Sequence, residues 1–188
     1  MVVLRAQWKS AQPHWDARKL VFIDETGLNT KMARLYGRCP VGQRCGSAVP
    51  YGHWQSSTFI AALRYEGIGA PFLIEGAVDA DVFTAYLQHV LCPELRPGDV
   101  VILDNLSTHK IQNVEKLISA QGASVRYLPP YSPDLNPIEQ AFAKLKAHLR
   151  QAAARTLDEL QHALARALPA FSSTHCRNFF HDAHYTTN

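Results

Sequence analysis

Residues 128–150 read LPPYSPDLNPIEQAFAKLKAHLR, and this stretch decides how the second half of the chain folds. Its prolines fix φ repeatedly and oppose both a helix and a central strand until the last of them; they are Pro129, Pro130, Pro133 and Pro137. Asn136 stands where a helix cap belongs, and Pro137 suits the first helical position. We therefore predict a stiff loop that leads into a helix beginning at Pro137.

The predicted helix carries one apolar stripe, because Ile138, Phe142, Leu145 and Leu149 recur at helical spacing. Glu139 lies beside this stripe in the first turn. It has two interpretations. Asn136-x-x-Glu139 resembles a capping box, in which the acid only satisfies a backbone N–H. Alternatively, the loop holds the Glu139 carboxylate in a defined place for chemistry.

Two upstream segments share a pattern in which an apolar run ends in an acid. Residues 20–23 (LVFI) precede Asp24, and residues 100–103 (VVIL) precede Asp104. Short continuous apolar runs are typical of strands buried on both faces, where an acid is unusual. Each aspartate could simply begin a turn. Two matching acids together with Glu139 instead indicate a metal site.

The order of the remaining elements predicts an α/β fold with a mixed central sheet flanked by helices. We expect two strands joined across residues 67–69 as a hairpin, a helix capped near Asp79 and Asp81 and stopped by Pro93, and a strand–helix–strand crossover. The two acids before the first helix are interpreted as caps rather than ligands. The expected elements are strands 58–65 and 70–74, helix 81–92, strand 100–104, helix 111–121 and strand 125–128.

Three blocks in this order resemble the catalytic blocks of the DDE transposases, and most closely the mariner-related bacterial insertion-sequence group, family six-thirty. They are FIDETG (22–27), LDNLSTH (103–109) and LPPYSPDLNPIEQAF (128–142). The interval of 139 − 104 − 1 = 34 residues between Asp104 and Glu139 is the spacing of that group. The resemblance covers about residues 20–150 and implies a ribonuclease-H-like fold.

The resemblance implies metal-dependent cleavage at transposon ends and strand transfer into target DNA, as in cut-and-paste transposition. Asp24, Asp104 and Glu139 would be the catalytic residues and would hold two Mg²⁺ ions, with Mn²⁺ as a substitute, Asp24 bridging both. Hard ions prefer oxygen ligands, and a pair of ions roughly 4 Å apart serves phosphodiester cleavage. Asn105 and His109 follow Asp104 in the family block and are expected near the site; the alternative for His109 is a residue at a helix start with local hydrogen bonds.

Several basic and aromatic residues are candidates for DNA contact. Residues 31–58 are rich in Gly and Arg and are predicted to form strand–turn pieces near the first aspartate. This basic loop either holds DNA phosphates or is a solvated hairpin. In the proline-rich loop, Tyr131 and Ser132 are candidates. The lysines of the following helix either bind phosphate or solvate that face. The basic candidates are Lys31, Arg34, Arg38, Lys144 and Lys146.

Composition sets bounds on the class of protein. The 188 residues, 47% hydrophobic and 19% charged, favour one globular domain. A formal net charge of +3 permits nucleic-acid binding without arguing for it. Apolar runs are too short for a membrane span or a signal peptide. The cysteines show no paired spacing, which indicates a reducing, cytoplasmic setting with free thiols and disfavours a zinc site built from Cys39, Cys45 and His53. The resemblance implies that this cytoplasm is bacterial.

The expected domain organisation is a leader (residues 1–18), with Trp8 and Trp15 packing onto the domain, and a catalytic domain (residues 19–188). A complete transposase of this type carries a helix-turn-helix DNA-binding region before the first catalytic strand, but only about twenty residues precede Asp24. We therefore expect this region to be absent and its partner to be a separately encoded helix-turn-helix protein from an overlapping frame. The rival explanation is a truncated remnant. The resemblance also implies a homodimer.

The C-terminal segment is interpreted as structural. Thr156-x-x-Glu159 predicts a capping box, and the aromatic tail predicts a helix that covers the core or a dimer contact. A metal site in the tail, from His175, Cys176, His181 and His184, is disfavoured because no ligand spacing repeats. Three other functions compete with the transposase: a nuclease of the same fold without strand transfer, an inactive or DNA-binding remnant, and a small-molecule enzyme, which the lack of a Gly-rich phosphate loop disfavours.

Overall fold

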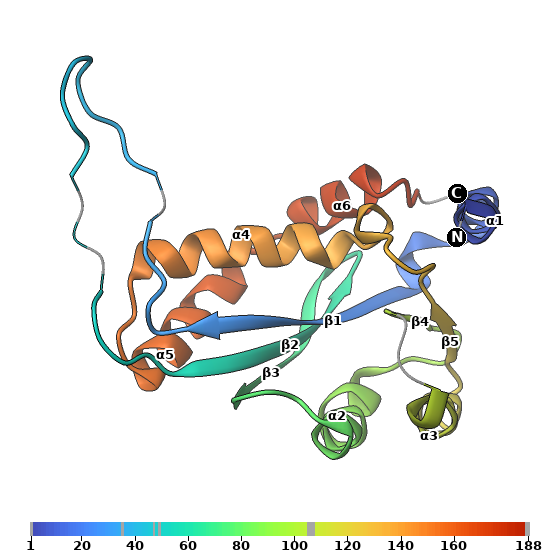
Figure 1. Cartoon of the computed structure of the whole chain (residues 1–188). Helices are drawn as coiled ribbons and strands as arrows, with labels where there is room; N and C mark the ends of the chain where they lie inside the picture. Colours follow the sequence, from blue (N-terminus) through green and yellow to red (C-terminus); the bar gives the residue numbers. More distant parts are fainter. Residues whose placement is uncertain (1, 35, 47, 49, 105–107, 187–188) are drawn as a thin grey trace.

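A five-stranded sheet with strand order β3-β2-β1-β4-β5 forms the centre of the protein (Figure 1). The computed structural model describes residues 2–34, 36–46, 48, 50–104 and 108–186, with the backbone but not the side chains of 108–112. β1 pairs antiparallel with β2, and β2 with β3, whereas β1, β4 and β5 are parallel. This confirms the predicted mixed sheet. The strands are β1 (Leu20–Asn29), β2 (Ser56–Arg64), β3 (Gly67–Glu75), β4 (Val100–Leu103) and β5 (Ser124–Tyr127).

Helices cover both faces of the sheet (Figure 1). Along β1, Leu20 and Phe22 belong to one buried core, and Val21 and Ile23 to another, because successive strand residues point to opposite faces. The first core lies under α4, α5 and α6, and the second lies against α2 and α3. The predicted α/β class is therefore confirmed. The helices are α1 (Val2–Ala11), α2 (Ala80–Tyr86), α3 (Thr108–Ser119), α4 (Pro137–Ala152), α5 (Leu157–Ala167) and α6 (Ser173–Asp182).

Helix α4 begins as predicted, with Asn136 at the N-cap position and Pro137 in the first turn. The stripe that includes Ile138, Phe142 and Leu145 is fully buried, and α4 lies against β1 and β2. The helix is thus fixed on the sheet by burial of one face. The capping box of α5, from Thr156 and Glu159, is also confirmed.

Strand β1 is longer than its apolar run, which corrects the prediction that the strand ends at Asp24. Antiparallel pairing with β2 continues to Asn29, and Asp24 lies opposite Ala61 in mid-strand. The continuous apolar run identifies only the part of β1 that is covered on both faces. Beyond Ile23, burial alternates, with Thr26 and Leu28 buried on the α4 side. The alternative that Asp24 begins a turn is therefore wrong.

Two local boundaries also differ from the prediction. The β2–β3 turn is formed by Tyr65 and Glu66, and residues 67–69 already belong to β3. Asp79 is confirmed as the cap of α2, since its carboxylate accepts hydrogen bonds from the backbone N–H groups of Asp81 (3.0 Å) and Val82 (2.9 Å). Asp81 lies in the first turn rather than at the cap.

The segment between β1 and β2 projects from the end of the sheet as a long excursion (Figure 1). Among its described residues between 31 and 55 there is no strand, so the predicted strand–turn pieces are wrong. At the base, the Thr30 N–H donates to the Gln55 carbonyl (3.1 Å), and the Lys31 ammonium lies 4.3 Å from the centre of the Trp54 ring. The excursion is therefore anchored only where it leaves the sheet, among the contacts that the structure describes.

The two ends of the chain lie side by side (Figure 1). Trp8 and Trp15 pack against the core, as predicted, and the Trp8 Nε1–H donates to the Tyr185 hydroxyl (2.9 Å). α6 covers the core with Phe180, whose ring lies 5.4 Å from that of Phe22, which confirms the predicted aromatic C-terminal helix. The boundary between leader and catalytic domain at residue 18 stays a prediction. None of the described helices has the length and apolarity to cross a bilayer.

Candidate active site

The register of two parallel strands brings Asp24 and Asp104 to the same face of the sheet. Phe22 of β1 lies beside Ile102 of β4, and both side chains belong to the core under α4. Asp24 and Asp104 each come two residues later, and side chains two residues apart along a strand share a face. The side chains of both aspartates are therefore placed on the face of the sheet that α4 covers. The equal offset of each acid from its apolar run was the sequence signal for this arrangement.

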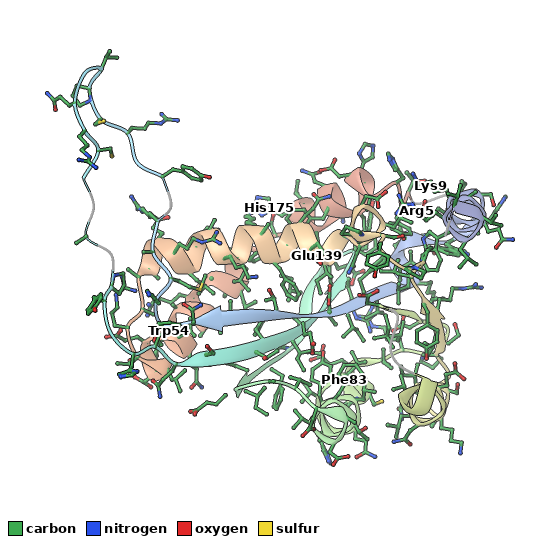
Figure 2. All side chains as sticks on the ribbon, in the orientation of Figure 1. Arg5, Lys9, Trp54, Phe83, Glu139 and His175 are labelled. Atoms are coloured by element: carbon green, nitrogen blue, oxygen red, sulfur yellow. The ribbon has the colours of Figure 1, made fainter. Side chains whose placement is uncertain are left out.

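Glu139 and the two aspartates line one cavity of about 360 Å³. Glu139 comes from the first turn of α4, beside β1 (Figure 2). The proline-rich loop after β5 closes the other side, because β5 is parallel to β1 and β4 and its carboxyl end opens at the same edge. The other described residues that line it are Leu128, Pro130, Tyr131, Ser132, Pro133 and Asn136.

Asp24 is the partly buried acid of this cavity. One carboxylate oxygen accepts a hydrogen bond from the Glu25 backbone N–H (2.8 Å), and the other accepts one from the Asn136 side-chain amide (2.9 Å). Burial raises the pKa of Asp24 to about 7, the Glu25 N–H acts against this rise, and the charges of Glu139 and Asp104 add to it. The cavity therefore gathers three carboxyl groups where burial and mutual repulsion make the ionised form of Asp24 unfavourable. A bound cation would offset this repulsion.

Asn136 is a site residue that the sequence interpretation assigned to another role. Its side chain makes no capping bond to α4, so the capping-box interpretation of Asn136 and Glu139 is wrong. The main chain satisfies the helix instead, because the Glu139 N–H donates to the Asn136 carbonyl (3.2 Å). This leaves the buried amide free to turn toward Asp24, with its Oδ1 atom lacking a hydrogen-bond partner among the described residues. The sequence prediction of the site used the positions of the acidic residues, and these gave no indication that a side-chain amide belongs to the same cavity.

The loop that closes the cavity has an unusual backbone. Tyr131 adopts a left-handed conformation (φ 54°) and is 85% exposed on the cavity lining. A non-glycine residue in this region costs about 1–3 kcal/mol, so surrounding contacts must hold it. Ser132 is buried, and its hydroxyl donates to the Pro130 carbonyl (3.3 Å). The predicted DNA contact by Tyr131 thus has an exposed side chain next to the acids.

A second hollow, of about 500 Å³, lies farther along β1 and α4 and is basic. Lys31, Lys146 and Arg150 line it together with Trp54. Lys146 follows Glu139 by seven residues, or roughly 10 Å along the helix at 1.5 Å per residue. The structure thus brings together two of the predicted DNA-binding lysines and adds Arg150. The signal for Arg150 was its i+4 spacing from Lys146.

The other predicted DNA contacts lie elsewhere. The Lys144 ammonium lies 5.2 Å from the centre of the Phe171 ring, in the segment before α6, and Lys144 lines neither hollow. Arg34 and Arg38 are exposed on the excursion and line neither hollow. Their role in DNA binding stays a prediction. Asn105 and the side chain of His109, expected near the site, lie outside the described residues.

The residues of the cavity fit a hard divalent cation by donor chemistry. Among the residues that the structure describes, its ionisable lining groups besides Tyr131 are the three carboxylates, and the orphaned Asn136 oxygen adds a neutral oxygen donor. Mg²⁺ and Mn²⁺ take such oxygen ligands, whereas zinc sites favour Cys and His. In the described part of the chain, no three His, Cys, Asp or Glu side chains already form a metal site. The assignment to a cation therefore rests on the shared cavity and its charge.

Comparison with solved structures shows the same fold in transposases. The chain matches a Mos1 transposase paired-end complex with the left transposon end with a TM-score of 0.71 and 16% identity over 97% of this chain and 57% of the other. It matches a mariner Mos1 paired-end complex with Mg with a TM-score of 0.63 and 19% identity over 97% of this chain and 55% of the other. It also matches the catalytic domain of Mos1 mariner transposase, with a TM-score of 0.64 and 13% identity over 97% of this chain and 85% of the other. The chain thus spans little more than half of the chains in the DNA complexes. These likenesses confirm the expected ribonuclease-H-like fold.

A search of curated proteins by sequence finds no match. The family model described as DDE superfamily endonuclease matches residues 19–161, which include both aspartates, the proline-rich loop and Glu139. This match covers more than half of the 188 residues. The chain belongs to the DDE superfamily endonucleases.

Proposed function

We propose that this chain is the catalytic part of a DNA transposase, which cleaves strands at transposon ends and transfers them into target DNA. The observation that carries the proposal is the single cavity lined by Asp24, Asp104 and Glu139 at the carboxyl edge of the parallel strands. Membership of the DDE endonucleases supports the hydrolytic half of the reaction. The likeness to transposase complexes with transposon ends supports the choice of DNA as substrate.

The three carboxylates would hold two Mg²⁺ ions, and Mn²⁺ would substitute. Solved relatives in complex with Mg or with Mn support this choice of ion. When bound, such ions supply an activated water or 3′-hydroxyl and neutralise charge on the phosphate. The chain contributes the positions of the ligands: β1 and the Asn136 amide orient Asp24, and the first turn of α4 presents Glu139. The exposed Tyr131 borders the cavity where the DNA strand would enter.

We assign the basic hollow to the DNA backbone. Lys31, Lys146 and Arg150 would contact phosphates roughly 10 Å from the scissile bond, or about three base steps at 3.4 Å per step. Such contacts set the register of the strand and carry no sequence information. Recognition of the terminal repeats would then fall to another part, for which we propose a separately encoded helix-turn-helix protein. A homodimer that acts on DNA in the bacterial cytoplasm completes the proposal.

The test is a cleavage and joining assay on DNA that carries the inverted repeats flanking this reading frame. Purified chain, with the upstream-frame protein added where the locus encodes one, should nick the repeat end with Mg²⁺ and join it to a target plasmid. Asp104→Asn should abolish both reactions, because the cavity loses a charged ligand. Glu75→Gln, an exposed acid at the end of β3 and outside the cavity, is the matched control and should retain activity.

The products separate the proposal from its rivals. Cleavage without joining would identify a nuclease of the same fold. No cleavage, together with Mg²⁺ binding that is the same in wild type and Glu139→Gln, would indicate a remnant. Activity that survives Asp104→Asn would remove the proposed site.

A further inference from the structure

The loop between β5 and α4, residues 130–136, which we call the entry loop, is held by contacts from both ends of the chain. It carries Asn136, whose amide holds Asp24, and it leads directly into Glu139. Proline has no N–H to donate, so Pro130 and Pro133 each remove a donor that strand pairing of the entry loop would need. Its own backbone bonds join Leu135 to Ser132 (3.0 Å) and Asn136 to Pro133 (3.1 Å). Anchors from outside are therefore needed to fix its place over the sheet.

The first anchor comes from α1. The Arg5 guanidinium donates to both carboxylate oxygens of Asp134, at 2.8 and 2.7 Å. Figure 2 shows Arg5 and Lys9 on the side of α1 that faces the entry loop. Lys9 lies farther from the same carboxylate, at 4.0 Å. A bidentate fork fixes direction as well as distance, so this pair sets where Asp134 stands, two residues before Asn136.

The second anchor comes from the C-terminal tail. The Tyr185 hydroxyl donates to the Leu135 carbonyl (2.9 Å) and accepts from the Trp8 indole (2.9 Å). Tyr185 is buried, and its ring lies 4.9 Å from the ring of Phe22, two residues before Asp24 on the same face of β1. Tyr185 therefore connects β1, α1 and the entry loop in one rigid contact.

We propose that Arg5 and Tyr185 are positioning residues, which hold the entry loop so that Asn136 stays bonded to Asp24 and Glu139 faces the same cavity. Neither residue reaches the cavity itself; Arg5 acts through the Asp134 side chain, and Tyr185 acts through the Leu135 carbonyl. The catalytic part of the inference rests on the proposed function. The geometric part, that both chain ends fix the entry loop, stands independently of it.

An exposed ion pair contributes little to folding stability, and the Arg5 and Asp134 side chains are 29% and 52% exposed. Arg5 should therefore matter more for the order of the entry loop than for the stability of the whole domain. This separates a positioning role from a merely structural one. It also defines the control: Arg18 makes a similar two-oxygen contact with Asp16, at 3.0 and 3.2 Å, away from the entry loop.

The experiment compares Arg5→Ala, Arg5→Lys, Tyr185→Phe and Arg18→Ala in the full chain, by hydrogen–deuterium exchange and by Mn²⁺ titration without DNA. Arg5→Ala and Tyr185→Phe should speed exchange in residues 131–139 and weaken Mn²⁺ binding by about tenfold, as loss of groups that orient metal ligands does. Arg5→Lys should be intermediate, because lysine keeps the charge and loses the fork. Arg18→Ala should match wild type in both readouts. Melting temperature reports global stability in each protein.

In the cleavage assay, Arg5→Ala should lower kcat and leave KM for DNA unchanged. Adding Asp134→Ala to Arg5→Ala should cost nothing further, because both changes remove one contact. Wild-type exchange in residues 131–139 of Arg5→Ala, or faster exchange spread evenly over the domain, would overturn the positioning role. If exchange rises locally in Arg5→Ala while wild type cleaves no DNA, the proposed function fails and the geometric inference stands.

Discussion

Replacing Asp24 by Asn should stabilise the metal-free protein above pH 7. Burial raises the pKa of this carboxyl from 3.8 to about 7, with added repulsion from Glu139, Asp104 and Glu25. Each pKa unit corresponds to about 1.36 kcal/mol, so holding Asp24 ionised in the folded state costs about 4 kcal/mol. Asparagine has nearly the same shape and carries no charge, but its single oxygen can accept only one of the two hydrogen bonds that the Asp24 carboxylate accepts, from the Glu25 N–H and from the Asn136 amide.

The sign of the pH dependence follows from proton binding. Between about pH 4 and pH 7, folded Asp24 keeps a proton that the unfolded chain has lost. The wild-type free energy of unfolding therefore falls as pH rises through this window and levels off above it. The other carboxyl groups titrate in both proteins, so the difference between wild type and Asp24→Asn isolates this residue. After subtraction of about 1 kcal/mol for the one hydrogen bond that asparagine loses, that difference should be about 3 kcal/mol at pH 8 and about 1 kcal/mol at pH 5.

Urea denaturation in EDTA, followed by tryptophan fluorescence from pH 5 to pH 8, measures this difference. Mg²⁺ should then narrow the difference, because an ion that binds the folded wild type more tightly than the variant, which lacks one charged ligand, stabilises the wild type more. A variant within about 1 kcal/mol of wild type at pH 8, or a difference that does not shrink toward pH 5, would refute a desolvated carboxylate at this position.

Three further outcomes test other parts of the structure. Phe142→Ala, which removes a buried ring 6.1 Å from Phe59, should lower the free energy of unfolding by about 3–5 kcal/mol in urea melts. Thr156→Ala should cost about 1 kcal/mol by the same measure, through loss of the α5 cap. The double variant Lys146→Ala/Arg150→Ala should reduce the slope of log affinity for DNA against log salt by roughly 1.8, and an unchanged slope would remove the basic hollow from the DNA path.

The parts of the site that the sequence predicted are those set by local patterns. The equal four-residue apolar runs before Asp24 and Asp104 predicted two strands that present acids at one edge. Asn136 and Pro137 predicted the start of α4, and with it the place of Glu139. Each of these depends on residues close together in the sequence, where spacing fixes geometry.

The parts that it missed depend on pairing between distant segments. The full length of β1 is set by β2, which is separated from it by the excursion, and no alternation in residues 24–29 is strong enough to show it. The hydrogen bond from the Asn136 side chain to Asp24 joins residues that are 112 positions apart in the sequence. A capping motif and a bond to a distant carboxylate use the same residue type, so only the folded chain decides between them.

The mid-strand position of Asp24 links the electrostatics of the site to the packing of α4. On the α2 and α3 side, β1 is covered only as far as Ile23, whereas on the α4 side the cover continues to Leu28. Asp24 therefore meets partial desolvation from the helix that also brings Glu139 and Asn136. A shift of α4 away from β1 would rehydrate Asp24, break the Asn136 bond and separate the two carboxylates together. Packing of the α4 stripe and assembly of the cation site are therefore coupled in one equilibrium. The contacts of the entry loop with both ends of the chain favour the packed, assembled state.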